Sequence, residues 1–239
     1  MIDDGPRFKL MLYRMIKRFE LDLAVWPRPP ERAGDDWSDY WQCRFEDVLF
    51  RAGLGVRKLI EAAKISIEVQ GCPMDLSFAP TRGNRVPDTM NYHRVEEFYD
   101  VQNASATQLP IISVCHAIVH SYVLVPRFTY SGLDGLRLHD FFLASDKGRR
   151  HGVYLIKWRD LVENLVYPVT RDDICGLLSY RTGEGDELRI PLSTPGLSAE
   201  SRQQAIELYR NLSKNHAKAV KQFTAKCQAA RGLPPESSP

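Results

Sequence analysis

Two histidines separated by four positions form the strongest candidate site in this sequence. His116 and His120 lie in an apolar stretch with helical periodicity, and residues four apart share one face of a helix. Their rings can therefore meet one ligand or transfer protons at one substrate. A histidine of an apolar helix can equally be a packed residue whose ring nitrogens bond a backbone carbonyl or a carboxylate. The sequence leaves both interpretations open.

The spacing of metal-binding residue types does not indicate a metal site. A zinc-protease helix needs a glutamate directly after its first histidine, and Ala117 stands there. A third ligand would have to come from elsewhere, such as His93 or His139, and the five cysteines are scattered without a Cys-x-x-Cys pair. We therefore expect no structural metal and no cofactor. A metal-dependent hydrolase is kept as a second alternative.

Two short blocks, Arg57–Ser66 and Cys115–Tyr122, resemble the paired helices of the HEPN superfamily. Members of that superfamily are small helical bundles found in prokaryotic toxins, RNA-processing enzymes and conflict systems. Its nucleases carry an arginine, usually a polar residue, three variable residues and a histidine near the start of a late helix. In this chain His120 stands at the position of that histidine and His116 at the polar position. Cys115 occupies the arginine position, which departs from the pattern.

The resemblance implies a metal-independent reaction on RNA. It implies that His120 acts as general base or acid at the ribose hydroxyl or the leaving oxygen, with His116 assisting. The arginine of the pattern is expected to hold phosphate and to stabilise the transition state, which a cysteine does poorly. The cations on the preceding helix that can replace it are Arg57, Lys58 and Lys64.

Two functions follow from the resemblance. The first is an intracellular ribonuclease of a bacterial toxin or phage-defence system, with RNA as its partner. The alternative is a non-catalytic interaction or scaffold subunit that retains the helical pair and binds a protein partner of such a system. Active sites of the superfamily are commonly composite across two chains. Together with the strongly apolar segment 111–125, this predicts a homodimer.

A further group of cations lies in a short polar segment between two apolar runs. Arg149 and Arg150 belong to the segment 145–151, which is rich in turn-forming and charged residues. Such a turn suits contact with phosphate groups, so both arginines are candidate phosphate ligands. The alternative is a solvated hairpin tip that binds nothing.

Helical periodicity dominates the first half of the sequence. Apolar residues recur three and four positions apart in three segments: 7–23, 36–65 and 107–125. Gly53 and Gly55 are expected to bend or split the second of these helices. The intervening residues 71–101 contain many turn-forming residues and are expected to form a long loop.

The second half has a different pattern. Short apolar runs at 136–144 and 152–158 flank the polar turn and predict an antiparallel hairpin. A strand is expected near 187–191, and Ser198 begins a long helical pattern. We therefore predict an α+β fold that is mainly a helical bundle, in four parts: the bundle (1–126), a small antiparallel β unit with a short helix (127–196), a C-terminal helix that packs on the bundle (197–232) and a frayed tail (233–239).

Composition indicates a soluble, cytoplasmic protein. The chain has 239 residues, of which 44% are hydrophobic and 26% charged, as in ordinary globular proteins. No apolar segment reaches the roughly 18 residues that a membrane helix needs, and no signal-peptide pattern begins the chain. The net charge of +2 predicts no strong global attraction to nucleic acid or to a membrane.

Overall fold

The chain forms two compact units, residues 1–174 and residues 175–239, and each is described by itself. The computed structural model describes these parts of the chain: residues 4–25, 36–131, 135–174, 176–181 and 187–192. Both candidate histidines lie in the first unit.

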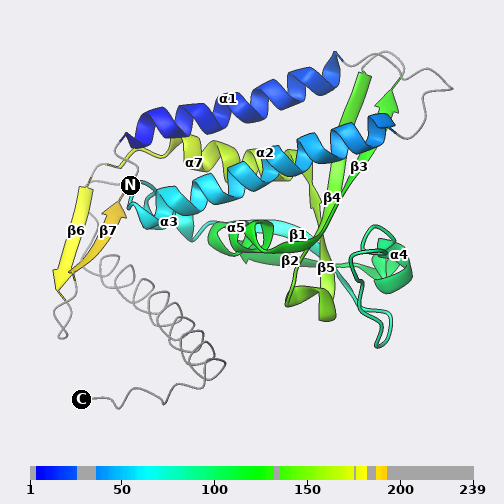
Figure 1. Ribbon diagram of the computed structural model, residues 1–239. Coiled ribbons are helices and arrows are strands. Elements are labelled where there is room, and N and C mark those ends of the chain that lie inside the picture. Colours follow the sequence, from blue (N-terminus) through cyan, green and yellow to red (C-terminus); the bar gives the residue numbers. More distant parts are fainter. Residues whose placement is uncertain (1–3, 26–35, 132–134, 175, 182–186, 193–239) are drawn as a thin grey trace, which may run out of the picture. The chain divides into compact units, whose positions relative to one another are not determined.

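A five-stranded antiparallel sheet is the framework of the first unit (Figure 1). The strands lie in the spatial order β2-β1-β5-β4-β3. Their bounds are β1 Pro73–Pro80, β2 Ser105–Pro110, β3 Ser121–Ser131, β4 Gly135–Ser145 and β5 Gly152–Lys157. Strands β2 and β3 are therefore the edges, whereas β4 is paired on both sides, with β3 and with β5.

Helices cover one face of this sheet. The two long ones are α1 (Gly5–Ala24) and α2 (Asp36–Glu61), which run side by side in Figure 1. The layer also contains α5 (Ile111–Val119), α6 (Trp158–Leu161), the π-helical turn η3 (Val162–Val166) and α7 (Tyr167–Arg171). Short helical turns lie in the connections: α3 (Ile67–Gln70), α4 (Val95–Phe98), η1 (Val101–Asn103) and η2 (Gly148–Arg150).

Strand β4 buries side chains on both of its faces. Phe141 faces the helices, and its ring centroid lies 5.2 Å from that of Phe45 on α2. Phe142 faces the opposite side, where it belongs to a second apolar cluster with Val95 and Phe98 of α4. Each fully buried side chain of this size stabilises the fold by about 1.5–3 kcal/mol. The sheet is thus covered by helices on one face and by the connection between β1 and β2 on the other.

Two glycines allow α2 to approach its neighbours closely. A Cβ atom at Gly53 would lie 2.7 Å from Cγ2 of Ile118 on α5, and one at Gly55 would lie 2.8 Å from Cδ2 of Leu12 on α1. The split predicted at these glycines is wrong, because α2 is one continuous helix to Glu61. Tertiary packing outweighs the helix penalty of glycine, which is about 1 kcal/mol per residue.

The helical bundle predicted from the sequence is wrong, although the fold is α+β as expected. The predicted loop 71–101 contains β1, which pairs with β2 on one side and with β5 on the other. Pro73 and Pro80 stand at the two ends of this strand, where a missing amide N–H costs least. The sequence pattern therefore did not predict this central strand, because the turn-forming residues at its ends are typical of a loop.

The third predicted helix, 107–125, is wrong over much of its length. Helix α5 ends at Val119, and the chain continues from Ser121 as strand β3. A continuous apolar run does not distinguish a buried helix from a buried strand, and the β-branched residues at Val123 and Val125 favour the strand. The first predicted helix, the 136–144/152–158 hairpin and the strand near residue 187 are confirmed.

The second unit contains an antiparallel pair of strands, β6 (Gly176–Arg181) and β7 (Glu187–Leu192), in which Leu178 faces Ile190 across the ladder. The predicted C-terminal helix (197–232) and the predicted tail (233–239) lie outside the described residues. None of the helices in the described residues has the length and apolar character needed to cross a membrane.

A β-bulge in β4 brings three polar side chains together. Arg127 pairs with Asp140 and Phe128 with Leu138, so His139 is the extra residue of the ladder. Nδ1 of His139 lies 2.7 Å from Oδ2 of Asp140, and the guanidinium of Arg127 binds the same carboxylate through two nitrogens. Burial opposes the ionisation of Asp140, but the hydrogen bonds from Arg127 and His139 outweigh it and lower the pKa of this carboxyl.

A buried ion pair joins the beginning of α1 to the end of α7. Nζ of Lys9 donates to the backbone carbonyl of Asp172 and lies 3.6 Å from its Oδ2. The carboxylate of Asp172 also accepts from the backbone N–H of Ser66 at 2.6 Å and from its hydroxyl at 2.7 Å. Burial lowers the pKa of the Lys9 amine although Asp172 opposes this effect. Three segments distant in sequence are therefore fastened at one point.

We expect Asp172→Ala to lower the free energy of unfolding by about 3 kcal/mol, because the charge of Lys9 and the amide of Ser66 would stay buried without this partner. Lys9→Met is expected to lower the free energy of unfolding less in the Asp172→Ala background than in the wild type. Urea denaturation of the four proteins in this double-mutant cycle measures the coupling. Strict additivity of the two substitutions would contradict the ion pair.

We expect Asp140→Asn to lower the free energy of unfolding at pH 7 by about 1–2 kcal/mol, through weaker hydrogen bonds to Arg127 and His139. The pKa of Asp140 in the folded state lies below its ordinary value of 3.8. The contribution of the charged carboxylate is therefore complete above this value and is lost as the pH falls through the folded-state pKa. Chemical denaturation should show the difference between wild type and variant shrinking below about pH 4; a constant difference would refute this account.

Candidate functional site

Helix α5 separates its apolar side chains from its two histidines. Ile111, Val114, Cys115 and Ile118 are buried, whereas His116 and His120 are exposed. The helix starts after Pro110, a residue well suited to a helix start because it lacks an amide N–H. It ends at Val119, and the N–H of the next residue, His120, donates to the carbonyl of His116 at 3.1 Å. The two imidazole rings are adjacent, with centroids 4.9 Å apart.

The two histidines line a hollow of about 560 Å³ beside α5, which we call the histidine hollow. Its other lining residues come from the end of β2, from α5, from β5 and from the turn after β4: Leu109, Ser113, Ala117, Ser145, Asp146, Lys147, Gly148 and Tyr154. Two imidazoles, one ammonium, one carboxylate and three hydroxyls therefore share one accessible space. This set can transfer protons and bind an anion.

The pairing of β3 with β4 places Asp146 and Lys147 beside His120. Ser121 faces Ser145 in the ladder, and the next residue, Asp146, donates its backbone N–H to the carbonyl of His120 at 3.1 Å. The hydroxyl of Ser145 accepts from the backbone N–H of Gly148 at 3.1 Å and so closes the turn. Lys147 thus lies between two residues, Asp146 and Gly148, whose backbone N–H groups are both hydrogen-bonded.

Cys115, at the arginine position of the HEPN pattern, points into the core. It is 1% exposed and belongs to the main apolar cluster. Burial raises the pKa of its thiol to about 12, so the thiolate form is suppressed at neutral pH. A side chain at this position faces away from the histidine hollow, and the cation there comes from another element.

The predicted phosphate ligands on the preceding helix do not line the histidine hollow. Arg57 and Lys58 lie at the end of α2 and both bind Glu61, at 2.9 and 2.7 Å. Hydrogen bonding from Lys58, followed by that from Arg57, lowers the pKa of Glu61 despite partial burial. Lys64 packs with its aliphatic carbons beside Gly5, at the start of α1.

The predicted phosphate ligands in the polar turn lie close to the histidine hollow but do not line it. The guanidinium of Arg149 stacks 3.5 Å from the ring centroid of Tyr122, donates to the carbonyl of Pro87 and pairs with Asp146 at 3.2 Å. Arg150 is exposed on η2. Arg149 therefore fastens the turn to its surroundings.

Asp146 and Lys147 line the histidine hollow, although from the sequence they are only members of the polar turn 145–151, whose predicted phosphate ligands are Arg149 and Arg150. They directly follow β4, and their proximity to α5 results from strand pairing between residues far apart in sequence. A charged turn that follows an apolar strand was the available signal. Within the described parts of the chain, no three His, Cys, Asp or Glu side chains are grouped so that they could hold a metal ion.

No protein-family model, no curated protein and no solved structure matches this chain.

We expect Cys115 to resist alkylation in the folded protein, because burial raises the pKa of its thiol to about 12 and excludes the reagent. Cys43 is exposed and serves as the internal control. Brief treatment with iodoacetamide at pH 7.5, followed by peptide mass spectrometry, should modify Cys43 and leave Cys115 unmodified until denaturant is added. Equal modification of both thiols in the folded protein would contradict this arrangement of α5.

Proposed function

We propose that this protein is a metal-independent endoribonuclease whose reaction takes place in the histidine hollow. The observation that carries the proposal is that His116, His120 and Lys147 line the same accessible space. Two imidazoles can serve as a base and an acid, and an ammonium group binds phosphate. Both rings are exposed, so a phosphodiester can reach them.

The reaction needs two proton transfers and no metal. His120 takes the proton of a ribose 2′-hydroxyl, and the 2′-oxygen forms a bond to phosphorus. The bond from phosphorus to the 5′-oxygen of the next nucleotide breaks, and His116 gives that oxygen its proton. Lys147 stabilises the negative charge that develops on the phosphoryl oxygens. The products are a 2′,3′-cyclic phosphate and a free 5′-hydroxyl.

The HEPN resemblance also implies RNA as the substrate. It places the phosphate-binding cation at the position of Cys115, whereas we assign this role to Lys147. Its two blocks, residues 57–66 and 115–122, include parts of α2 and α5, which contact each other. Cys115 cannot hold phosphate from the core, and Lys147 takes over that role in our proposal. A role in a bacterial toxin or defence system, with RNA or a protein as partner, rests on the resemblance and belongs to the same proposal.

We expect the wild-type protein to cleave pooled RNA in the presence of EDTA and to leave cyclic phosphate ends. His120→Ala should reduce the rate by about 10²–10⁴-fold, since it removes the general base. Lys147→Met should also reduce the rate, and Lys147→Arg should restore much of it, since the charge returns. Gel analysis of end-labelled RNA measures the rates, and thermal melting verifies that each variant is folded.

His151→Ala is the matched control, because His151 is an exposed histidine of the same turn region that does not line the histidine hollow. It should cleave RNA at the wild-type rate. Absence of cleavage with or without divalent metal would overturn the proposal and favour a non-catalytic scaffold. Cleavage that requires added metal would favour a metal-dependent hydrolase instead.

A further inference from the structure

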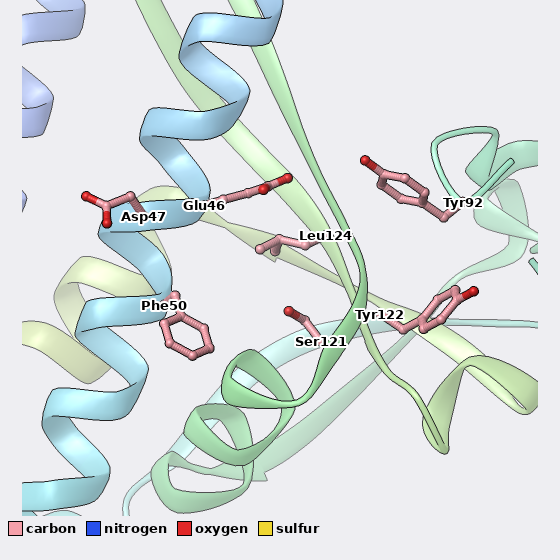
Figure 2. A pocket seen from close by; sticks show the side chains of 7 residues that line it. All are labelled: Glu46, Asp47, Phe50, Tyr92, Ser121, Tyr122 and Leu124. Carbon is pink, nitrogen blue, oxygen red and sulfur yellow. The ribbon is translucent and has the colours of Figure 1, made fainter. Parts of the chain in front are cut away.

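A second hollow adjoins the candidate site along the chain. His120 lines the histidine hollow and the next residue, Ser121, lines a separate space of about 420 Å³, a volume typical of small-ligand pockets, which span about 300–1,000 Å³. Its lining residues come from α2, from the segment before α4 and from the start of β3: Glu46, Asp47, Phe50, Tyr92, Ser121, Tyr122 and Leu124. We call this space the aromatic hollow (Figure 2).

The aromatic hollow combines flat apolar surfaces with carboxylate oxygens. Phe50 and Tyr92 provide the rings, since that of Tyr122 is already stacked on the guanidinium of Arg149. Figure 2 shows the side chains of Glu46 and Tyr92 pointing toward each other. Burial raises the pKa of Tyr92, and the negative charge of Glu46 raises it further. Among the described residues, none that lines the hollow is a lysine or arginine. The chemistry therefore disfavours a phosphate group and favours a flat ring with hydrogen-bond donors on its edge.

A hydrogen bond from Gln42 orients the carboxylate of Glu46. Nε2 of Gln42 donates to Oε1 of Glu46 at 2.6 Å and to the carbonyl of Leu124 at 3.1 Å. Gln42 thus ties α2 to the edge strand β3 and holds the carboxylate at the hollow. A carboxylate has about four acceptor positions, so the amide leaves capacity for two further donors. The neighbouring Asp47 instead binds Arg51 at 2.7 Å.

We propose that the aromatic hollow binds a guanine base, as the specificity subsite of the proposed ribonuclease. Guanine presents two adjacent donors, N1–H and the N2 amino group, which match the two oxygens of a carboxylate. Adenine and cytosine present an amino group next to an acceptor nitrogen, and uracil presents one N–H between two carbonyls, so each would place an acceptor against Glu46. The rings of Phe50 and Tyr92 stack on the base, and Ser121 of this hollow is next in sequence to His120 of the histidine hollow.

The first test measures binding of guanosine, inosine and adenosine to the full-length protein by isothermal titration calorimetry. Guanosine should bind at least tenfold more tightly than inosine. Inosine lacks the N2 amino group and therefore one hydrogen bond to the charged carboxylate, and the loss of such a bond weakens binding by about tenfold or more. Adenosine should bind no more tightly than inosine. Equal affinity for the three nucleosides, or no binding, would overturn the guanine subsite.

Two substitutions on α2 distinguish recognition of guanine by the carboxylate of Glu46 from a general effect of negative charge on this helix. Glu46→Gln should weaken guanosine binding by tenfold or more and leave adenosine binding unchanged. Asp39→Asn removes the same charge from an exposed residue of α2 that does not line the hollow, and it should have little effect. Tyr92→Leu should weaken binding of all nucleosides, because it removes a stacking surface. An equal effect of Glu46→Gln and Asp39→Asn would show that only the negative charge of α2 matters and would refute the proposal.

Cleavage of the dinucleotides GpU and ApU distinguishes failure of the subsite from failure of the proposed function. Faster cleavage of GpU, with the preference lost in Glu46→Gln, supports both. Cleavage without preference for GpU overturns the guanine subsite and leaves the ribonuclease intact. Selective guanosine binding without cleavage of either dinucleotide retains the guanine site and overturns the ribonuclease.

Discussion

The burial of β4 on both of its faces is the constraint on which the rest of the first unit depends. The four consecutive residues Phe141 to Ala144 are each at most 3% exposed, so neither face of this strand can be left to water. The long helices cover one face, and the connection that contains α4 covers the other. The bulge at His139 shifts the alternation of side chains by one residue, so Leu138 and Phe141 both face the helical layer although they are an odd number of positions apart.

The same strand determines where the candidate chemistry is located. Once β4 is paired with β3, the turn that follows β4 must lie beside the residue that precedes β3, and that residue is His120. The close contact between α2 and α5 at Gly53 turns the apolar side of α5 inward and leaves its histidines outward. The two hollows then differ in charge, with Lys147 in one and Glu46 in the other. In our proposals this difference separates the phosphate from the base of a nucleotide.

Much of the local structure could be predicted because local patterns decide it. The first helix is amphipathic over its whole length, and the hairpin of β4 and β5 has apolar runs on either side of a polar turn. The central strand β1 could not be recognised, because its end prolines are typical of loops when only neighbouring residues are considered. The segment after Val119 was misread for a related reason: a run that is apolar on every side has no period by which to choose between helix and strand.

The sequence by itself determined the α+β class, the amphipathic first helix and the proximity of His116 to His120, since all of these depend on residues within a few positions of one another. Only the tertiary structure decided which cation accompanies the histidines. Arg57 and Lys58 bind Glu61 at the end of α2, Arg149 stacks on Tyr122, and Lys147 reaches the histidine hollow. These differences arise from strand register and helix packing between distant segments, which depend on the burial of apolar surface over the whole unit and not on the spacing of charges in the chain.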